Sequence, residues 1–192
     1  MAYSRSLVSN GSPSSDSGPK PSEHPTVARV VSVASELGLA IAPVRFPDET
    51  RTAADAAAAI GVSVSRIVKS LVFAVGDGSA ARGAPDAEGE SAELVMAFVG
   101  GDRQLDVIKL ARAAGATKAW RVDADAVRAA TGFAVGGVPP LGHSSKLRLF
   151  VDPGLLAFEE VWAAAGTPRD VFAMPPNFLV TSLGATVIDL AI

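Results

Sequence analysis

The sequence predicts a mixed α/β domain in which a mixed, barrel-like β-sheet is surrounded by helices. Segments with helical spacing alternate with β-branched segments, but without the strict strand–helix–strand rhythm of a parallel sheet. Hydrophobic residues make up 48% of the 192 residues, which is enough to bury a sizeable core. We therefore expect one domain over residues 25–192. A disordered tail, rich in Ser, Pro and Gly, is expected over residues 1–24.

The first third of the domain is expected to hold two helices and a short strand. Apolar residues recur at helical spacing between Val27 and Leu37, and Gly38 is suited to end that helix. Residues 41–46 predict a short strand. An alanine-rich helix follows over residues 52–61, with a threonine positioned to cap its start and a glycine to end it.

A β-hairpin is expected next. Residues 66–75 are β-branched and aromatic and are apolar on both faces, which is typical of a central strand. Residues 93–101 predict its partner. The intervening residues 76–92 are polar and rich in Gly, Ala and Ser, so we expect a mobile loop there.

Two capped helices and a strand follow the hairpin. Asp102 is placed to cap a helix over residues 103–115, because an acidic side chain can accept hydrogen bonds from the first free N–H groups. Residues 117–122 predict a strand. Asp123 is placed in the same way to cap a helix over residues 124–132.

The last part of the chain predicts further strands and one helix. Residues 146–152 predict a strand. Residues 158–166 fit either a helix or a strand, and we favour a strand. A short strand is expected over residues 170–174, a helix over 176–184 and a closing strand over 185–192.

Composition excludes several classes of function. The formal net charge of −3 argues against a broad basic surface for non-specific nucleic-acid binding. The chain has no cysteine, so it has neither disulfides nor a thiol nucleophile. With only two histidines, no metal site and no cofactor are expected. A secretory signal and an apolar run of about 18 residues are both missing, so we expect a cytoplasmic protein without a membrane span.

Lys69 is an anomaly within the expected central strand. Side chains alternate along a strand, so Lys69 shares a face with Leu71 and Phe73, while Ser70 and Val72 lie on the other face. A lysine is almost never fully buried unless it is paired. Either its ammonium reaches solvent at a sheet edge, or it lines a pocket and meets an anion.

A second unusual feature is the stretch "GFAVGGVPPLGH" over residues 132–143. Gly136 and Gly137 permit unusual backbone angles and close approach of a ligand, and Pro139 and Pro140 fix the segment that follows. The free N–H groups of residues 136–138 could converge on an anion or a developing oxyanion. The alternative is a plain turn between two elements.

Two titratable residues have open roles. His143 could be a general base or a hydrogen-bond donor, although a lone histidine is more often structural. Asp170 could orient a substrate amine, or it could be a solvated acid in a turn.

Four segments together resemble the YbaK/ProX (YbaK/EbsC) family of aminoacyl-tRNA deacylases, which also occurs as the editing insertion of bacterial prolyl-tRNA synthetases. They are "RIVKSLVF", "DVIKLARAAGATKA", "ATGFAVGGVPPLGH" and "AAGTPRDVFAMPPNFLVTSLGATVIDLA". The resemblance covers roughly two-thirds of the chain, in the family's order. It implies a compact α/β fold around a barrel-like sheet. It also implies hydrolysis of the ester that joins a wrong amino acid to tRNA, usually the proline tRNA.

The resemblance also implies roles for individual residues. Lys69 would hold the terminal adenosine near its phosphate, and Gly136 and Gly137 would contact the substrate carbonyl. His143 completes the expected catalytic set, because either this side chain or the substrate itself would orient the attacking water. The substrate-binding set would be Ser70, Val138, Pro139, Pro140, Gly142 and Asp170. The implied partners are the acceptor end of a misacylated tRNA and a prolyl-tRNA synthetase. Two alternatives stay open, namely an idle module that binds tRNA or a synthetase, and a hydrolase of a small-molecule ester.

A small positive field is expected where the acceptor end would bind. Four basic residues could supply it locally despite the acidic net charge: Arg66, Lys69, Lys146 and Arg148.

Overall fold

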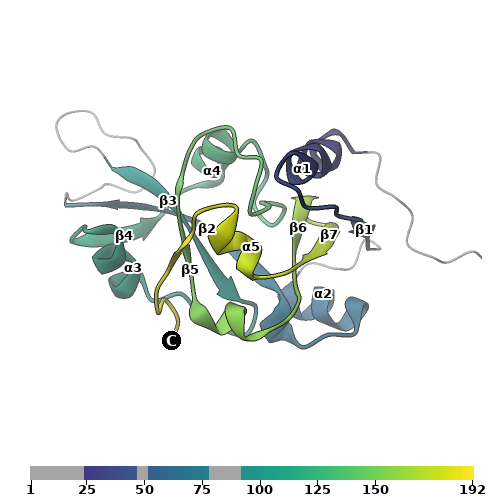
Figure 1. Ribbon diagram of the computed structural model, residues 1–192. Coiled ribbons are helices and arrows are strands. Elements are labelled where there is room, and N and C mark those ends of the chain that lie inside the picture. The colour runs from purple at the N-terminus through teal and green to yellow at the C-terminus, as the bar shows by residue number, and fades with distance from the viewer. Residues whose placement is uncertain (1–23, 47–51, 78–91) are drawn as a thin grey trace, which may run out of the picture.

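A computed structural model describes residues 24–46, 52–77 and 92–192, which form a mixed α/β fold with two β-sheets (Figure 1). The predicted α/β class is confirmed, but the sheets do not close into a barrel. The expected tail falls outside the described residues except for its last residue, His24, and most of the expected loop, residues 78–91, also falls outside. Within the described residues, no helix has the length and apolarity to cross a membrane.

The larger sheet carries the predicted hairpin. Its strands, in spatial order, are β4 (Lys118–Arg121), β2 (Val68–Gly76), β3 (Glu93–Gly100), β5 (Arg148–Val151) and β8 (Thr186–Val187). Strands β2 and β3 pair antiparallel from Val68 to Val75 of β2, which confirms the hairpin. On its other side β2 pairs with β4 only from Phe73 onward. From Val68 to Val72, β2 therefore has an open edge within the described part of the chain.

The smaller sheet is built from strands that lie far apart in sequence. Its order is β1 (Val44–Arg45), β7 (Asp170–Met174) and β6 (Val161–Thr167). The preferred strand interpretation of residues 158–166 is confirmed, whereas the strand expected over 41–46 shrinks to two residues. A single parallel bridge between Ile67 and Trp162 joins the two sheets at the start of β2. This one bridge replaces the continuous ladder that a closed barrel would need.

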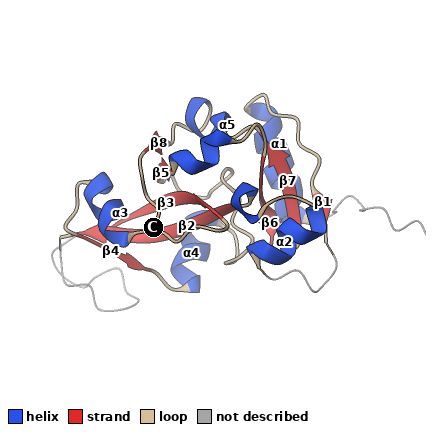
Figure 2. Cartoon of the chain, turned by 90° about the horizontal axis from the view of Figure 1, so that it is seen from below, coloured by secondary structure: helices blue, strands red, loops and turns tan. Residues whose placement is uncertain are grey.

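The helices cover the sheets on several sides (Figures 1 and 2). They are α1 (Pro25–Glu36), α2 (Ala53–Ile60), α3 (Val107–Ala114), α4 (Ala124–Thr131) and α5 (Asn177–Thr181), with two short 3₁₀ helices at Val64–Arg66 and Pro153–Ala157. Because side chains alternate along β2, its two faces pack against different helices. Val72 lies in one apolar cluster with Val127 of α4, and Phe73 lies in another with Leu110 of α3.

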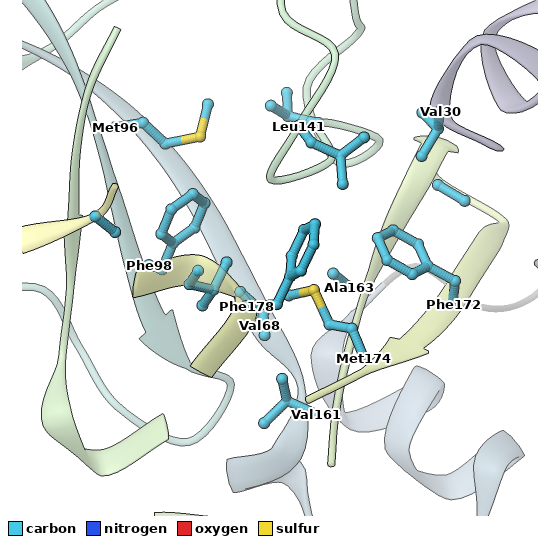
Figure 3. Close-up of a cluster of buried hydrophobic side chains, with 14 of the residues drawn as sticks. Val30, Val68, Met96, Phe98, Leu141, Val161, Ala163, Phe172, Met174 and Phe178 are labelled. Atoms are coloured by element: carbon cyan, nitrogen blue, oxygen red, sulfur yellow. The ribbon is translucent and has the colours of Figure 1, made fainter. Parts of the chain in front are cut away.

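The main core lies between the two sheets. Figure 3 shows Met96 and Phe98 of β3 facing Phe172 and Met174 of β7, with Phe178 of α5 between them. The first four side chains are at most 1% exposed. Two sheets joined by one bridge are thus held together chiefly by this apolar contact.

Three of the expected helix starts can be compared with the structure. Thr52 caps α2, in a reciprocal capping box with Asp55, and Asp123 caps α4, as predicted. The prediction for Asp102 is wrong, because α3 begins four residues later than its position implies. Asp106 caps α3 and accepts hydrogen bonds from Ile108 N at 2.8 Å and Lys109 N at 3.2 Å.

The expected closing strand over residues 185–192 is mostly wrong, and Asp152 supplies the reason. Only Thr186 and Val187 pair as a strand. Further along, the buried carboxylate of Asp152 accepts hydrogen bonds from Leu190 N at 3.0 Å and Ala191 N at 3.1 Å. A side chain therefore occupies N–H groups that a neighbouring strand would otherwise bind.

Replacing Asp152 should destabilise the fold. Asp152→Ala leaves the buried N–H groups of Leu190 and Ala191 without an acceptor, so we expect the free energy of unfolding to fall by about 3 kcal/mol. Urea unfolding at pH 7 measures this change. Asp189→Ala is the matched control, because that carboxylate is largely exposed and should change stability little. Equal stability of the two variants would contradict the role of Asp152.

Candidate functional site

A cavity of about 950 Å³ lies at the open edge of β2. Its walls are β2 itself, the start of α3, the end of β4, and the loop that follows α4. It brings together four of the predicted site residues: Lys69, Ser70, Gly136 and Val138. The other six do not line it: Gly137, Pro139, Pro140, Gly142, His143 and Asp170. Strand β4 does not pair with residues 68–72 of β2. Side chains from both faces of β2 therefore reach the same cavity at this uncovered edge.

Lys69 is half-buried in the wall of this cavity. Its ammonium donates a hydrogen bond to the backbone oxygen of Arg103, in the turn that leads from β3 towards α3. Burial lowers the pKa of Lys69, and the negative charge of Asp102 acts in the opposite direction. The side chain therefore lines a pocket, and its ammonium is held close to the turn.

Ser70 points to the opposite face of β2 from Lys69. Its Oγ is buried and has no hydrogen-bond partner among the described residues. An unpartnered buried hydroxyl costs free energy, so such atoms are uncommon in native proteins.

The loop after α4, residues 132–143, which we call the glycine loop, has two rather than three unbonded backbone amides at residues 136–138. Gly137 N donates to Ala134 O at 3.0 Å and closes a tight turn, so the expectation that its N–H faces a ligand is wrong. Gly136, at φ +85°, and Val138 both line the cavity. Within the described part of the chain, neither of their N–H groups has a hydrogen-bond partner. These two amides are the backbone donors that remain for an anion.

Gly137 instead packs against the turn between β6 and β7. A methyl group at Gly137 would lie 2.7 Å from both the Cα and the carbonyl carbon of Thr167, which is closer than real contacts allow. The position requires glycine because another backbone passes so near. The glycine loop is therefore located by the β6–β7 turn behind it.

Asp170 braces that same turn. Its carboxylate is fully buried, accepts a hydrogen bond from the hydroxyl of Thr167, and lies 3.9 Å from the guanidinium of Arg45. The interpretation of Asp170 as a solvated turn acid is wrong. The other carboxylate oxygen, Oδ1, is buried without a partner in the described residues. Asp170 lies in the β6–β7 turn that contacts the glycine loop, and it does not line the cavity.

His143 also supports the loop from outside the cavity. Its Nε2 lies 2.7 Å from the carbonyl oxygen of Pro139, which can only accept, so Nε2 carries the proton. Its ring meets Phe133 edge-on, with 6.5 Å between the ring centres. Burial lowers the pKa of His143, the bond to Pro139 opposes this shift, and the positive charge of Arg29 adds to it.

The structure changes the set of basic residues that could attract an anion. Arg66 forms an ion pair with Glu160 at 3.0 Å, and Arg148 forms one with Glu93 at 2.7 Å. Arg121, which the sequence analysis missed, lines the cavity together with Lys69. An arginine at the end of a strand is common, so only its pairing opposite Phe73 on β2 could have indicated this role.

No group of three or more potential metal ligands occurs among residues 24–46, 52–77 and 92–192. The polar groups in the wall of this cavity include the Lys69 ammonium, the Arg121 guanidinium and the Asp106 carboxylate, together with the backbone of Gly136 and Val138.

Comparison with known proteins shows which family this chain belongs to. Residues 47–181 match the family model described as the aminoacyl-tRNA editing domain. The crystal structure of a protein assigned provisionally as a trans-editing enzyme for prolyl tRNA synthetase superposes with a TM-score of 0.76. It is 38% identical and covers 89% of this chain and 99% of its own.

Two relatives are similar to this chain in sequence. The uncharacterized protein YwhH of Bacillus subtilis is 30% identical over 134 residues, or 70% of this chain and 76% of its own. A proline–tRNA ligase of Pelotomaculum thermopropionicum is 31% identical over 111 residues, or 58% of this chain. The match spans only 16% of that ligase.

The buried His143 should make stability depend on pH. Its pKa in the folded protein lies below the ordinary value of 6.5, so the unfolded chain binds a proton more readily. We expect the free energy of unfolding to fall as the pH decreases below 6.5, by at most about 1.4 kcal/mol per pH unit. Urea unfolding between pH 7.5 and pH 5 measures the slope. His143→Gln, which can still donate to Pro139 O, should lose this component, and an unchanged slope would rule the assignment out.

Proposed function

The chain belongs to the aminoacyl-tRNA editing domain family, and on this premise we propose that it is a trans-editing hydrolase. Its substrate in this proposal is a misacylated tRNA, namely proline tRNA that carries a non-cognate amino acid. The observation that carries the proposal is that Lys69 and the loop of Gly136 and Val138 line one cavity, although they lie far apart in sequence.

The two free amides suit the acyl end of such a substrate. An aminoacyl ester is already activated, so its hydrolysis needs a placed water and a stabilised oxyanion rather than a strong nucleophile. Water attacks the carbonyl carbon, and the negative charge that develops on the carbonyl oxygen is stabilised by Gly136 N–H and Val138 N–H. The bond to the ribose oxygen then breaks. That oxygen takes up one proton of the attacking water, the other proton passes to solvent, and the amino acid leaves as its carboxylate. One such donor contributes about 3 kcal/mol to lowering the barrier.

Lys69 suits the nucleotide end. A phosphate beside the ribose could displace the contact of the ammonium with the Arg103 carbonyl, since an ammonium–phosphate contact is stronger than one to a neutral oxygen. The ester would then lie between Lys69 and the glycine loop. Ser70, in the same wall, would contact the bound group through its carbon atoms, because its hydroxyl is buried.

His143 and Asp170 act in this proposal as positioning residues. His143 holds Pro139, and Asp170 holds the β6–β7 turn on which Gly137 rests. Pro139, Pro140 and Gly142 shape the loop between these supports. The site therefore uses its titratable side chains to fix backbone amides in place, which is how preorganised donors are kept ready for a transition state.

The remaining parts of the proposal concern the cell and its partners. We assign the catalytic domain to residues 25–192 and its location to the cytoplasm, where charged tRNA is made. A net charge of −3 gives weak attraction for the whole tRNA, so a prolyl-tRNA synthetase is proposed as the partner that delivers it.

Lys69→Ala should abolish most of the deacylation. Removing an ionic contact to phosphate costs about 1.5–3 kcal/mol, so we expect kcat/KM to fall about 10- to 100-fold with the fold intact. The assay follows release of the amino acid from proline tRNA that carries Ala, Cys, Ser or Pro, and from alanine tRNA that carries Ser. Lys118→Ala, at the exposed start of β4, is the matched control and should retain activity.

The same assay separates the alternatives. Lys69-dependent release of one non-cognate amino acid, with prolyl-tRNA spared, is the expected result. A folded protein that releases none of them would favour an idle binding module. Equal turnover of a simple aminoacyl ester without RNA, independent of salt, would favour a small-molecule hydrolase.

A further inference from the structure

Exposed apolar side chains gather around the mouth of the cavity. In the described residues, six large apolar side chains are exposed, and four of them line this one cavity: Val107, Ile108, Val135 and Ile192. Val107, Ile108 and Val135, which we call the apolar rim, are 41%, 68% and 59% exposed. They come from two separate segments, the first turn of α3 and the glycine loop.

The rim keeps much of its apolar surface exposed. Helix α3 buries Leu110 and Ala111 against the sheet, whereas Val107 and Ile108, in the first turn of the same helix, are left exposed. Val135 precedes the exposed Gly136 at the tip of the loop. Apolar side chains that are exposed together at a cavity are typical of a surface that a ligand covers.

Charged groups beside the rim favour an anionic occupant. Lys69 and Arg121 line the cavity, and no hydrogen bond or ion pair of the Arg121 guanidinium is found among the described residues. Two acids lie near these cations. Asp106 lines the cavity but accepts two backbone N–H bonds at the start of α3, and Asp102 acts on Lys69.

The cavity is also larger than an amino acid ester needs. A volume of about 950 Å³ is at the upper end of the range for pockets that enclose whole drug-sized ligands. Lys69 is half-buried, whereas the rim is exposed, so Lys69 lies deeper and the rim lies at the mouth. A substrate attached to a long polymer would leave the cavity at this mouth, where the rim lies.

We propose that the apolar rim and Arg121 form a subsite for the unpaired nucleotide that precedes the 3′-terminal nucleotide of the RNA. The base packs on Val107, Ile108 and Val135, and Arg121 binds the phosphate. Unpaired bases expose apolar faces, and contacts to these faces tolerate any sequence. This inference rests on the proposed function, because it places the ester-bearing nucleotide on Lys69 and the glycine loop.

Binding of uncharged RNA tests the subsite without any need for catalysis. Fluorescence anisotropy would compare a labelled RNA hairpin ending in an unpaired CCA with the same hairpin cut to a blunt end. The wild-type protein should bind the first about tenfold more tightly. Ile108→Ser and, independently, Val135→Ser should remove most of this preference, and Leu37→Ser, an exposed apolar residue on another surface, should keep it. No preference in the wild type, or a preference unchanged in both rim variants, would overturn the inference.

Salt dependence tests Arg121 separately. One phosphate contact on a single strand contributes about 0.7 to the slope of log K against log salt, so Arg121→Gln should reduce the slope by about this amount. Ile108→Ser and the control Arg112→Gln, near the far end of α3, should leave the slope unchanged. An unchanged slope in Arg121→Gln would remove this residue from the subsite.

Kinetics distinguish failure of the subsite from failure of the proposed function. Ile108→Ser should raise KM about five- to tenfold for aminoacyl-tRNA but leave hydrolysis of an aminoacyl ester of adenosine unchanged, because that ester ends before the rim. If the wild type hydrolyses neither substrate, the proposed function fails, and the preference for the CCA end still decides the subsite. Equal losses on both substrates would overturn the inference while leaving the hydrolase intact.

Discussion

The rest of this structure depends on where the pairing of β2 with β4 stops. Strand β4 has only four residues, and Asp123 starts α4 two residues after it ends, so the β4 ladder covers only the end of β2 from Phe73 onward. The chain then returns as the glycine loop beside the uncovered half of β2. An open edge is usually a liability for a sheet, and here it forms one wall of the cavity.

Local signals predicted most of the elements, and failures occurred where a distant residue decides. The two strands of the hairpin, the cap at Asp123 and the strand at 161–167 each follow from the pattern of their own residues. Asp102 and Asp106 are equally suited to cap a helix. The choice between them follows from the bridge of Leu105 to Ala191, which keeps residue 105 extended until Asp106. No window of the sequence around α3 contains that information.

The same distinction holds for the cavity. Lys69 and Gly136 are conspicuous in the sequence because a strand lysine and a glycine pair break local rules, and both line the cavity. Arg121 breaks no rule and was missed. Asp170 and His143 were noticed because their side chains can titrate. Each instead forms a hydrogen bond within the protein, His143 with the Pro139 carbonyl and Asp170 with the Thr167 hydroxyl. Which titratable groups face a ligand depends on side-chain directions that a linear pattern does not carry.

The position of Ile192 has a practical consequence. Its N–H donates to Gln104 O at 2.9 Å, and its side chain lines the cavity, so anything attached after it starts at the mouth. Helix α1 lies on the opposite side of the molecule from this end of the chain (Figure 1). An affinity tag or fluorophore joined after residue 192 would compete with the ligand for space. A dye joined after residue 192 would for the same reason report occupancy of the cavity directly.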